Sequence, residues 1–263
     1  MKKSISIILL FVLATTVFAQ EGEKQPKFRF GLKVSPSVAW LGPDKTKFND
    51  MSVESGGAKI KFGYGLITEF VLAKNYSFLT GVEVNYAGGS INYKDANSVS
   101  YKLNNDTTIF LKSREYKQQY ITIPIALKLK TNEIGYMTYF GQIGVDASFK
   151  IKGRANDKGN LYADTTTIGG QNFNVYISDY EESDVDILKQ INLFRVALNV
   201  GAGVEWNIAG NTSLLFAVNY NNGFINYFYN KTKDDNKLKD NTGEKLEEKA
   251  SSNYVALTVG VLF

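Results

Sequence analysis

Apolar side chains alternate with small or polar ones along much of this chain. In the last ten residues every second position is apolar: Val255, Leu257, Val259, Val261 and Phe263. A period of two places the apolar residues on one face of an extended strand and the others on the opposite face. The same alternation predicts seven further strands, over residues 28–40, 60–72, 76–87, 116–130, 137–150, 194–208 and 212–221.

The connections between these strands alternate in length. Those after the second, fourth and sixth strands are turns of a few residues, whereas four others are long and polar: 41–58, 88–115, 152–190 and 222–250. Short turns at one end and long extracellular loops at the other are typical of outer-membrane barrels. A small soluble barrel has no reason to sort its connections in this way. We therefore predict an all-β fold, an eight-stranded antiparallel up-and-down transmembrane β-barrel over residues 28–263 with long extracellular loops.

Aromatic residues gather near both ends of the predicted strands. Near the short turns lie Phe28, Phe78, Trp206 and Phe263, and toward the long loops lie Trp40, Tyr86, Phe149 and Tyr220. Aromatic rings are enriched where a membrane protein crosses the two interfaces between lipid and water. These residues are therefore predicted to form two aromatic girdles in contact with outer-membrane lipid.

The first residues have the features of an export signal. Lys2 and Lys3 precede an apolar run over 5–13, and small residues lead to Ala19. This order predicts a secretory signal peptide over residues 1–19, cleaved after Ala19, followed by a short periplasmic segment over 20–27. A retained membrane anchor is the alternative, which the polar segment 20–27 disfavours. After residue 19 no apolar run approaches the roughly 18 residues of a spanning helix. The predicted location is the outer membrane of a Gram-negative bacterium.

Composition excludes several kinds of chemistry. The net charge is +4, and removing Lys2 and Lys3 leaves +2, which argues against a nucleic-acid partner. There is no Cys and no His. Thiol chemistry is therefore absent, and so is the residue that most often serves as acid–base catalyst or metal ligand. We expect no enzymatic activity, no cofactor and no metal site.

Charged residues also occupy the face that would point into the lumen. They are Arg29, Lys33, Glu69, Glu83, Lys128, Asp146, Arg195 and Glu205. An eight-stranded barrel is just wide enough for its side chains to fill it. Because an isolated buried charge costs several kcal/mol, these residues are predicted to form an ion-pair network that plugs the lumen. A conduction path through the same charges is the alternative. A carboxylate pair of Glu69 and Glu83 would point into a lumen with no room for a substrate.

Two of the long loops carry dense charge. The acidic run comprises Asp179, Glu181, Glu182, Asp184 and Asp186. Carboxylates can hold Ca²⁺, but the run lacks a glycine-punctuated loop of fixed ligand spacing, so a solvated acidic face is favoured. Residues 231–249 mix Lys with Asp and Glu, and we interpret them as a solubilising loop.

Two prolines lie within predicted strands. Pro36 and Pro124 each lack the backbone N–H that a closed barrel would use in its ladder. We predict a bulge or a locally open ladder at each.

Several stretches resemble the PorT-like family of small outer-membrane β-barrel proteins. They are the signal peptide, YITIPIALKLK at 120–130, GAGVEW at 201–206 and the terminal aromatic residue. The likeness is a pattern that covers nearly the whole mature chain. It implies insertion by the outer-membrane barrel assembly machinery, which recognises the terminal strand, with Tyr254 and Phe263 as the assembly signal. It supplies no catalytic residue.

The resemblance also bears on the role of the protein, because some relatives are linked to protein secretion or adhesion, although most have no assigned role. We expect surface interaction, adhesion or envelope support through the extracellular loops, with an extracellular ligand that the sequence does not identify. A narrow porin-like channel for ions or small solutes is the alternative.

Overall fold

The computed structural model describes residues 27–44, 52–95, 99–104, 106–163, 167–168, 171–172, 175–231, 238–240 and 243–263. The predicted signal peptide, 1–19, lies outside the described residues. Within them one short 3-10 helix occurs, η2 (Leu188–Gln190), and no helix is long and apolar enough to cross a membrane. The strands are β1 (Phe28–Pro43), β2 (Val53–Ser55), β3 (Lys59–Ala73), β4 (Tyr76–Tyr93), β5 (Ser100–Asn104), β6 (Thr107–Lys130), β7 (Met137–Ala163), β8 (Thr167–Ile168), β9 (Gln171–Asn172), β10 (Val175–Asp186), β11 (Phe194–Ala209), β12 (Thr212–Gly223) and β13 (Ala250–Leu262).

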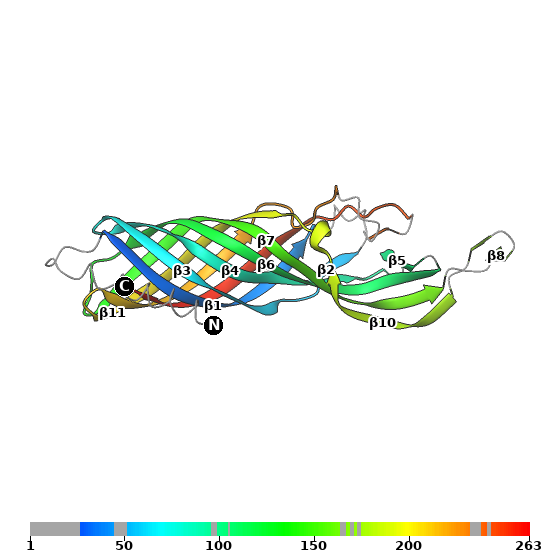
Figure 1. Ribbon diagram of the computed structural model, residues 1–263, viewed down its shortest axis with the longest axis horizontal. Coiled ribbons are helices and arrows are strands. Elements are labelled where there is room, and N and C mark those ends of the chain that lie inside the picture. The colour runs from blue at the N-terminus through cyan, green and yellow to red at the C-terminus, as the bar shows by residue number, and fades with distance from the viewer. Residues whose placement is uncertain are drawn as a thin grey trace, which may run out of the picture.

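Eight of these strands form a closed ring (Figure 1). Its order is β1-β3-β4-β6-β7-β11-β12-β13, and β13 pairs with β1 to close it. Neighbouring strands are antiparallel throughout the ring. The predicted eight-stranded antiparallel barrel is confirmed.

The barrel is apolar outside and mostly polar inside. On β13, Val255 and Leu257 are exposed, whereas the alternating Thr258 is buried. On β1, Leu32 is exposed and Arg29 is buried. A water-soluble barrel would bury its apolar face instead, because that burial drives folding in water. The exposed apolar face is the one expected of a barrel surrounded by lipid.

Both prolines lie at gaps in the strand ladder. The pairing of β1 with β13 runs from Val34↔Val259 directly to Ser37↔Ala256, and so omits Pro36. The pairing of β4 with β6 omits Pro124, although Pro124 remains paired with β7. The register is the same on both sides of each gap. The predicted local opening is therefore confirmed, without a bulge, because a proline offers no N–H to one of its two neighbours.

Two of the long segments are strands rather than irregular loops. β6 begins at Thr107 and β7 continues to Ala163, so this hairpin projects well beyond the ring (Figure 1). β10 pairs with the projecting part of β7, and β5 pairs with β6. The prediction of polar loops over 88–115 and 152–190 is wrong in this respect. Small and charged residues such as Gly153 and Asp157 occupy the buried face of β7. This part of the strand therefore lacks the apolar residue at every second position by which the other strands were predicted.

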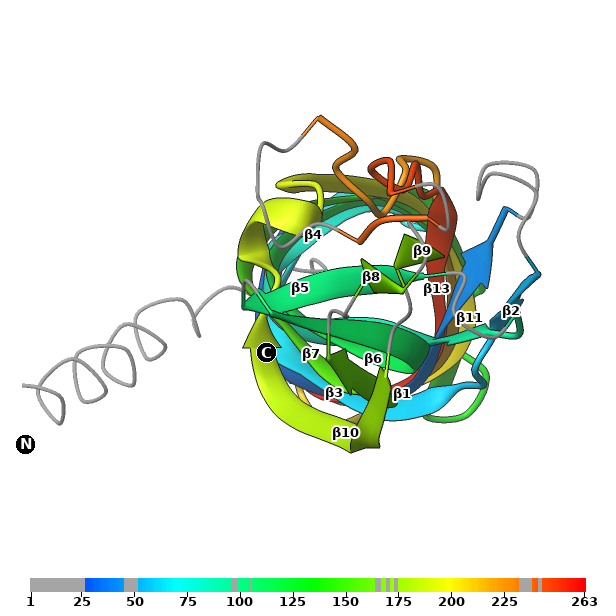
Figure 2. The same cartoon turned by 90° about the vertical axis from the view of Figure 1, so that its right-hand side faces the viewer.

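The four long segments also share a hydrophobic core outside the membrane. Its buried residues are Leu41, Val53, Ile91, Tyr93, Val99, Tyr101, Ile109, Leu111, Tyr116, Ala155, Ile187, Ile191, Tyr227, Phe228, Leu238, Leu246 and Ala250. We call the described parts of these segments the cap, and Figure 2 looks onto the end that carries it. Leu238 and Leu246 are fully buried. The interpretation of 231–249 as a merely solubilising loop is therefore wrong.

Candidate functional site

Five charged side chains close the lumen near the short turns, which is the periplasmic end. Arg29 Nη1 lies 2.6 Å from Glu205 Oε2 and 3.4 Å from Glu69 Oε2. Lys128 Nζ pairs with Glu205 and lies 3.2 Å from Glu69 Oε2. Lys130 Nζ lies 2.7 Å from Glu69 Oε1. We call these residues the periplasmic ion cluster. It joins four strands, β1, β3, β6 and β11, across the lumen.

A hydrophobic layer packs beside this cluster. It consists of Ile67, Leu79, Ala126, Phe140, Leu215, Ala217 and Leu262, all buried. The Nζ of Lys128 lies 4.2 Å from the centre of the Phe140 ring, a cation–π distance. Side chains of the ion cluster and of this layer thus occupy the lumen at this level, as the width of an eight-stranded barrel allows.

A separate ion pair joins Lys33 and Glu83 farther along the lumen. Lys33 and Glu83 are both paired in register with Gly65, which lies between them on β3. A Cβ atom at Gly65 would lie 2.3 Å from the backbone oxygen of Val82. The same Cβ atom would lie 3.1 Å from Glu83 Cγ, so the absence of a side chain at Gly65 leaves room for the glutamate that pairs with Lys33.

Asp146 and Arg195 do not join an ion pair within the described residues. The Asp146 carboxylate accepts hydrogen bonds from Asn221 Nδ2 at 2.6 Å and from Asn199 Nδ2 at 3.0 Å. Arg195 donates to Asn221 Oδ1 and to the backbone oxygen of Ser252. One amide, Asn221, thus stands between the two charges.

The structure corrects the predicted ion-pair network of eight charged residues by dividing it into separate groups. Arg29, Glu69, Lys128 and Glu205 come together, Lys33 pairs with Glu83, and Asp146 and Arg195 are hydrogen-bonded to amides. Within the described residues no ion pair or direct hydrogen bond joins these groups to one another, so the charges do not form one continuous network. Lys130 belongs to the periplasmic ion cluster but was missing from the predicted network. It has the same strand parity as Lys128, and that signal could have included it.

The cap contains a buried ion pair that sequence reasoning missed. Arg114 Nε and Nη2 each donate to the Asp157 carboxylate at 2.6 Å, and Arg114 is 1% exposed. Tyr101 OH donates to the same carboxylate at 2.9 Å. Although burial by itself lowers the pKa of the Arg114 guanidinium, the adjacent Asp157 raises that pKa well above its usual value. The guanidinium therefore remains charged, and the bidentate pair links β6 to β7 inside the cap.

The predicted girdle residues lie on the outer surface in two groups. At the short-turn end, the rings of Phe28 and Phe78 each contact Phe70, and Phe263 contacts Phe30. At the opposite end, Trp40 stacks on Tyr220 with ring centres 6.5 Å apart. Three further members are exposed on the same outer face, namely Tyr86, Phe149 and Trp206. Tyr254, by contrast, points inward, where its hydroxyl lies 3.5 Å from Asp146.

The acidic run lies on β10, not in an irregular loop. Glu181 Oε1 lies 2.9 Å from Lys158 Nζ, and Asp186 lies 3.5 Å from Arg154. The first pair is largely exposed and the second is exposed at Asp186 and partly exposed at Arg154, so each contributes little to stability. Within the described part of the chain no group of three or more acidic residues could hold a metal ion.

Comparison with known proteins gives one family and several solved structures. Residues 18–229 match the family described as outer membrane protein beta-barrel domain. Neisserial surface protein A is 13% identical, with 91% of this chain and 98% of that chain covered and a TM-score of 0.40. The attachment invasion locus protein Ail of Yersinia pestis is 12% identical, with coverages of 90% and 100% and a TM-score of 0.33. OprG of Pseudomonas aeruginosa is 10% identical, with coverages of 92% and 98% and a TM-score of 0.42. No curated protein matches the chain.

Proposed function

We propose that this chain, which belongs to the outer membrane protein beta-barrel domain family, is a non-enzymatic surface protein whose cap binds an extracellular partner. The observation that carries this proposal is the core of the cap, which contains residues from all four long segments. Connections that only join strands do not need such a core. A surface that is already ordered loses less conformational entropy when a partner binds. The more specific roles that we propose are adhesion and a link to protein secretion, both of which are associated with some members of the PorT-like family.

The surface best suited to a partner is the outer edge of β10. Within the described residues β10 pairs only with β7, so its other edge offers free backbone donors and acceptors. Val175, Tyr176 and Ile177 are each about half exposed. An extended segment can add to such an edge as a further strand, with side-chain contacts that determine specificity. The carboxylates of the acidic run favour a segment with net positive charge.

A lysine-rich extended peptide tests this proposal. A labelled peptide of alternating lysine and valine is expected to bind the purified protein, as measured by fluorescence anisotropy, and a glutamate–valine peptide is not. The double variant Tyr176→Ser/Ile177→Ser should weaken binding about tenfold, or about 1.4 kcal/mol, because apolar contact area is lost. Leu103→Ser, at an exposed residue of β5, is the matched control. Equal binding of both peptides, or an equal effect of the control, would contradict the proposed edge.

We also propose that the lumen does not conduct. The periplasmic ion cluster and the hydrophobic layer lie inside the barrel, and the cap core lies beyond its opposite end; these three features support this view. The purified protein in planar lipid bilayers is therefore expected to give no stable current steps. Reproducible, ion-selective steps would overturn this expectation in favour of a narrow channel.

Lipid and the assembly machinery are the two envelope partners that we propose. The girdle residues would contact lipid at both interfaces, which their outward positions support. The assembly signal would include Phe263, which is exposed on the outer surface, and Tyr254, which faces the lumen. No nucleic-acid partner is proposed, since the net charge is small.

A further inference from the structure

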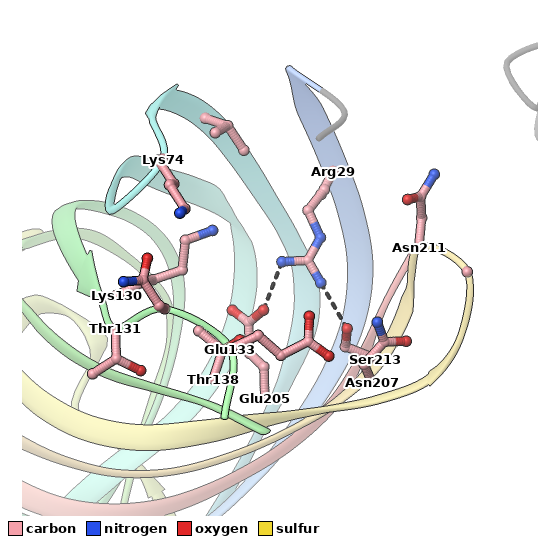
Figure 3. A pocket seen from close by; sticks show the side chains of 13 residues that line it. Arg29, Lys74, Lys130, Thr131, Glu133, Thr138, Glu205, Asn207, Asn211 and Ser213 are labelled. Carbon is pink, nitrogen blue, oxygen red and sulfur yellow. Dashed lines mark hydrogen bonds and ion pairs between the residues drawn. The ribbon is translucent and has the colours of Figure 1, made fainter. Parts of the chain in front are cut away.

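A cavity of about 410 Å³ opens at the periplasmic end, outside the ion cluster. We call it the vestibule. Its rim is made by the three short turns, including Lys74 of the β3–β4 turn and Glu133 of the β6–β7 connection. Arg29, Lys130 and Glu205 of the ion cluster line it as well. Figure 3 shows Lys74 and Lys130 directed into the same space that the Arg29 guanidinium faces. The cavity falls within the size range of small-molecule sites.

The charges around the vestibule are not balanced. The periplasmic ion cluster has three cations, Arg29, Lys128 and Lys130, and two carboxylates, Glu69 and Glu205, which leaves +1. All five side chains are at most 9% exposed. Each cation has a carboxylate partner, but three cations share two carboxylates. Because an uncompensated buried charge is costly, an anion in the adjoining cavity would stabilise the cluster.

The rim does not remove this excess. Lys74 adds one positive charge and Glu133 one negative charge, so four cations still stand against three carboxylates. Neither Lys74 nor Glu133 makes an ion pair with any residue in the described part of the chain. Lys74 therefore has its ammonium group available to a ligand.

We propose that the vestibule binds a small oxyanion, a phosphate or carboxylate group, between Lys74, Lys130 and Arg29. Charge-assisted hydrogen bonds from ammonium and guanidinium groups are the strongest that a protein offers such groups. Asn207, Asn211 and Ser213 line the same cavity and supply neutral donors. The anion can be a free solute of the periplasm or the headgroup of an anionic phospholipid, since both present the same oxygen atoms. This site is independent of the partner proposed for the cap.

Inorganic phosphate is the probe for this site. The protein in nanodiscs of phosphatidylcholine is expected to bind one phosphate in isothermal titration calorimetry. Lys74→Gln should weaken binding about tenfold, the effect of losing one charge-assisted contact. Glu133→Gln should strengthen binding, because a nearby negative charge is removed. Lys94→Gln, at an exposed lysine paired with Glu54 in the cap, is the control and should leave binding unchanged.

A second arm distinguishes the two sources of the anion. If phosphate binds equally in nanodiscs that contain phosphatidylglycerol, the site takes a free solute. If phosphatidylglycerol competes with phosphate, and Lys74→Gln removes the competition, the site takes a lipid headgroup. The proposal would be overturned if the protein in phosphatidylcholine nanodiscs bound no phosphate. It would also be overturned if Lys74→Gln and the unchanged protein bound phosphate with equal affinity.

Discussion

Glu69→Gln is expected to lower the free energy of unfolding of the barrel by about 3–5 kcal/mol, the cost of removing one partner from a buried ion pair. Glu69 is fully buried and lies within ion-pair distance of Arg29, Lys128 and Lys130. Glutamine keeps the size of the side chain but not its charge. Within the described residues, Arg29 and Lys128 would then have only the carboxylate of Glu205, and Lys130 would lose its one carboxylate partner.

The matched control for this substitution is Lys128→Met. It leaves two cations and two carboxylates in the periplasmic ion cluster, so its cost should be smaller. Urea titration in phospholipid vesicles measures both variants, with the fluorescence of Trp40 and Trp206 on the outer surface as the signal. An equal cost, or a larger cost for Lys128→Met, would contradict the view that charge balance controls the stability of the cluster.

Asp157→Asn should destabilise the cap by a similar amount while the barrel stays folded. The substitution leaves the guanidinium of Arg114, which is 1% exposed, without its carboxylate partner. Because β6 and β7 continue into the barrel as paired strands, the barrel should keep its heat-modifiable mobility on a gel. The cap is expected to become sensitive to protease added to intact cells.

Two further variants test the cause of that effect. Asp186→Asn removes the partly exposed ion pair between Asp186 and Arg154. Such a pair contributes about 0–1 kcal/mol, so the cap should stay resistant to protease. The double variant Arg114→Met/Asp157→Leu removes both buried charges and should recover much of the resistance, since no unpaired charge remains. Equal protease sensitivity of Asp157→Asn and Asp186→Asn would contradict a structural role for the buried pair.

The inward charges could be predicted from the sequence, but their partners could not. Strand parity alone places Arg29, Glu69 and Glu205 on the lumen side, where the structure has them. Arg29 and Glu205 are 176 residues apart in the sequence. Whether two such residues meet depends on the stagger between strands around the whole ring, which no local pattern records. For the same reason the hydrogen bonds of Asp146 to amides were not predicted.

The cap escaped prediction for a related reason. Leu238 and Leu246 stand among charged residues, and their neighbours in sequence suggest a solvated loop. They are buried because other segments, remote in sequence, cover them. The acidic run likewise gave no sign of the β10 strand, since its side chains are mostly exposed on both faces. Alternation is visible only where one face is apolar.

The sequence by itself determined the number of barrel strands, the face that each turns outward and the sorting of short and long connections. These properties depend on the residues of one strand or one connection, so they are visible in local periodicity and length. Only the tertiary structure decided which charges pair, how the long segments fold into a cap and where the vestibule lies. Those features depend on contacts between distant segments, which form once the register around the closed ring has been set.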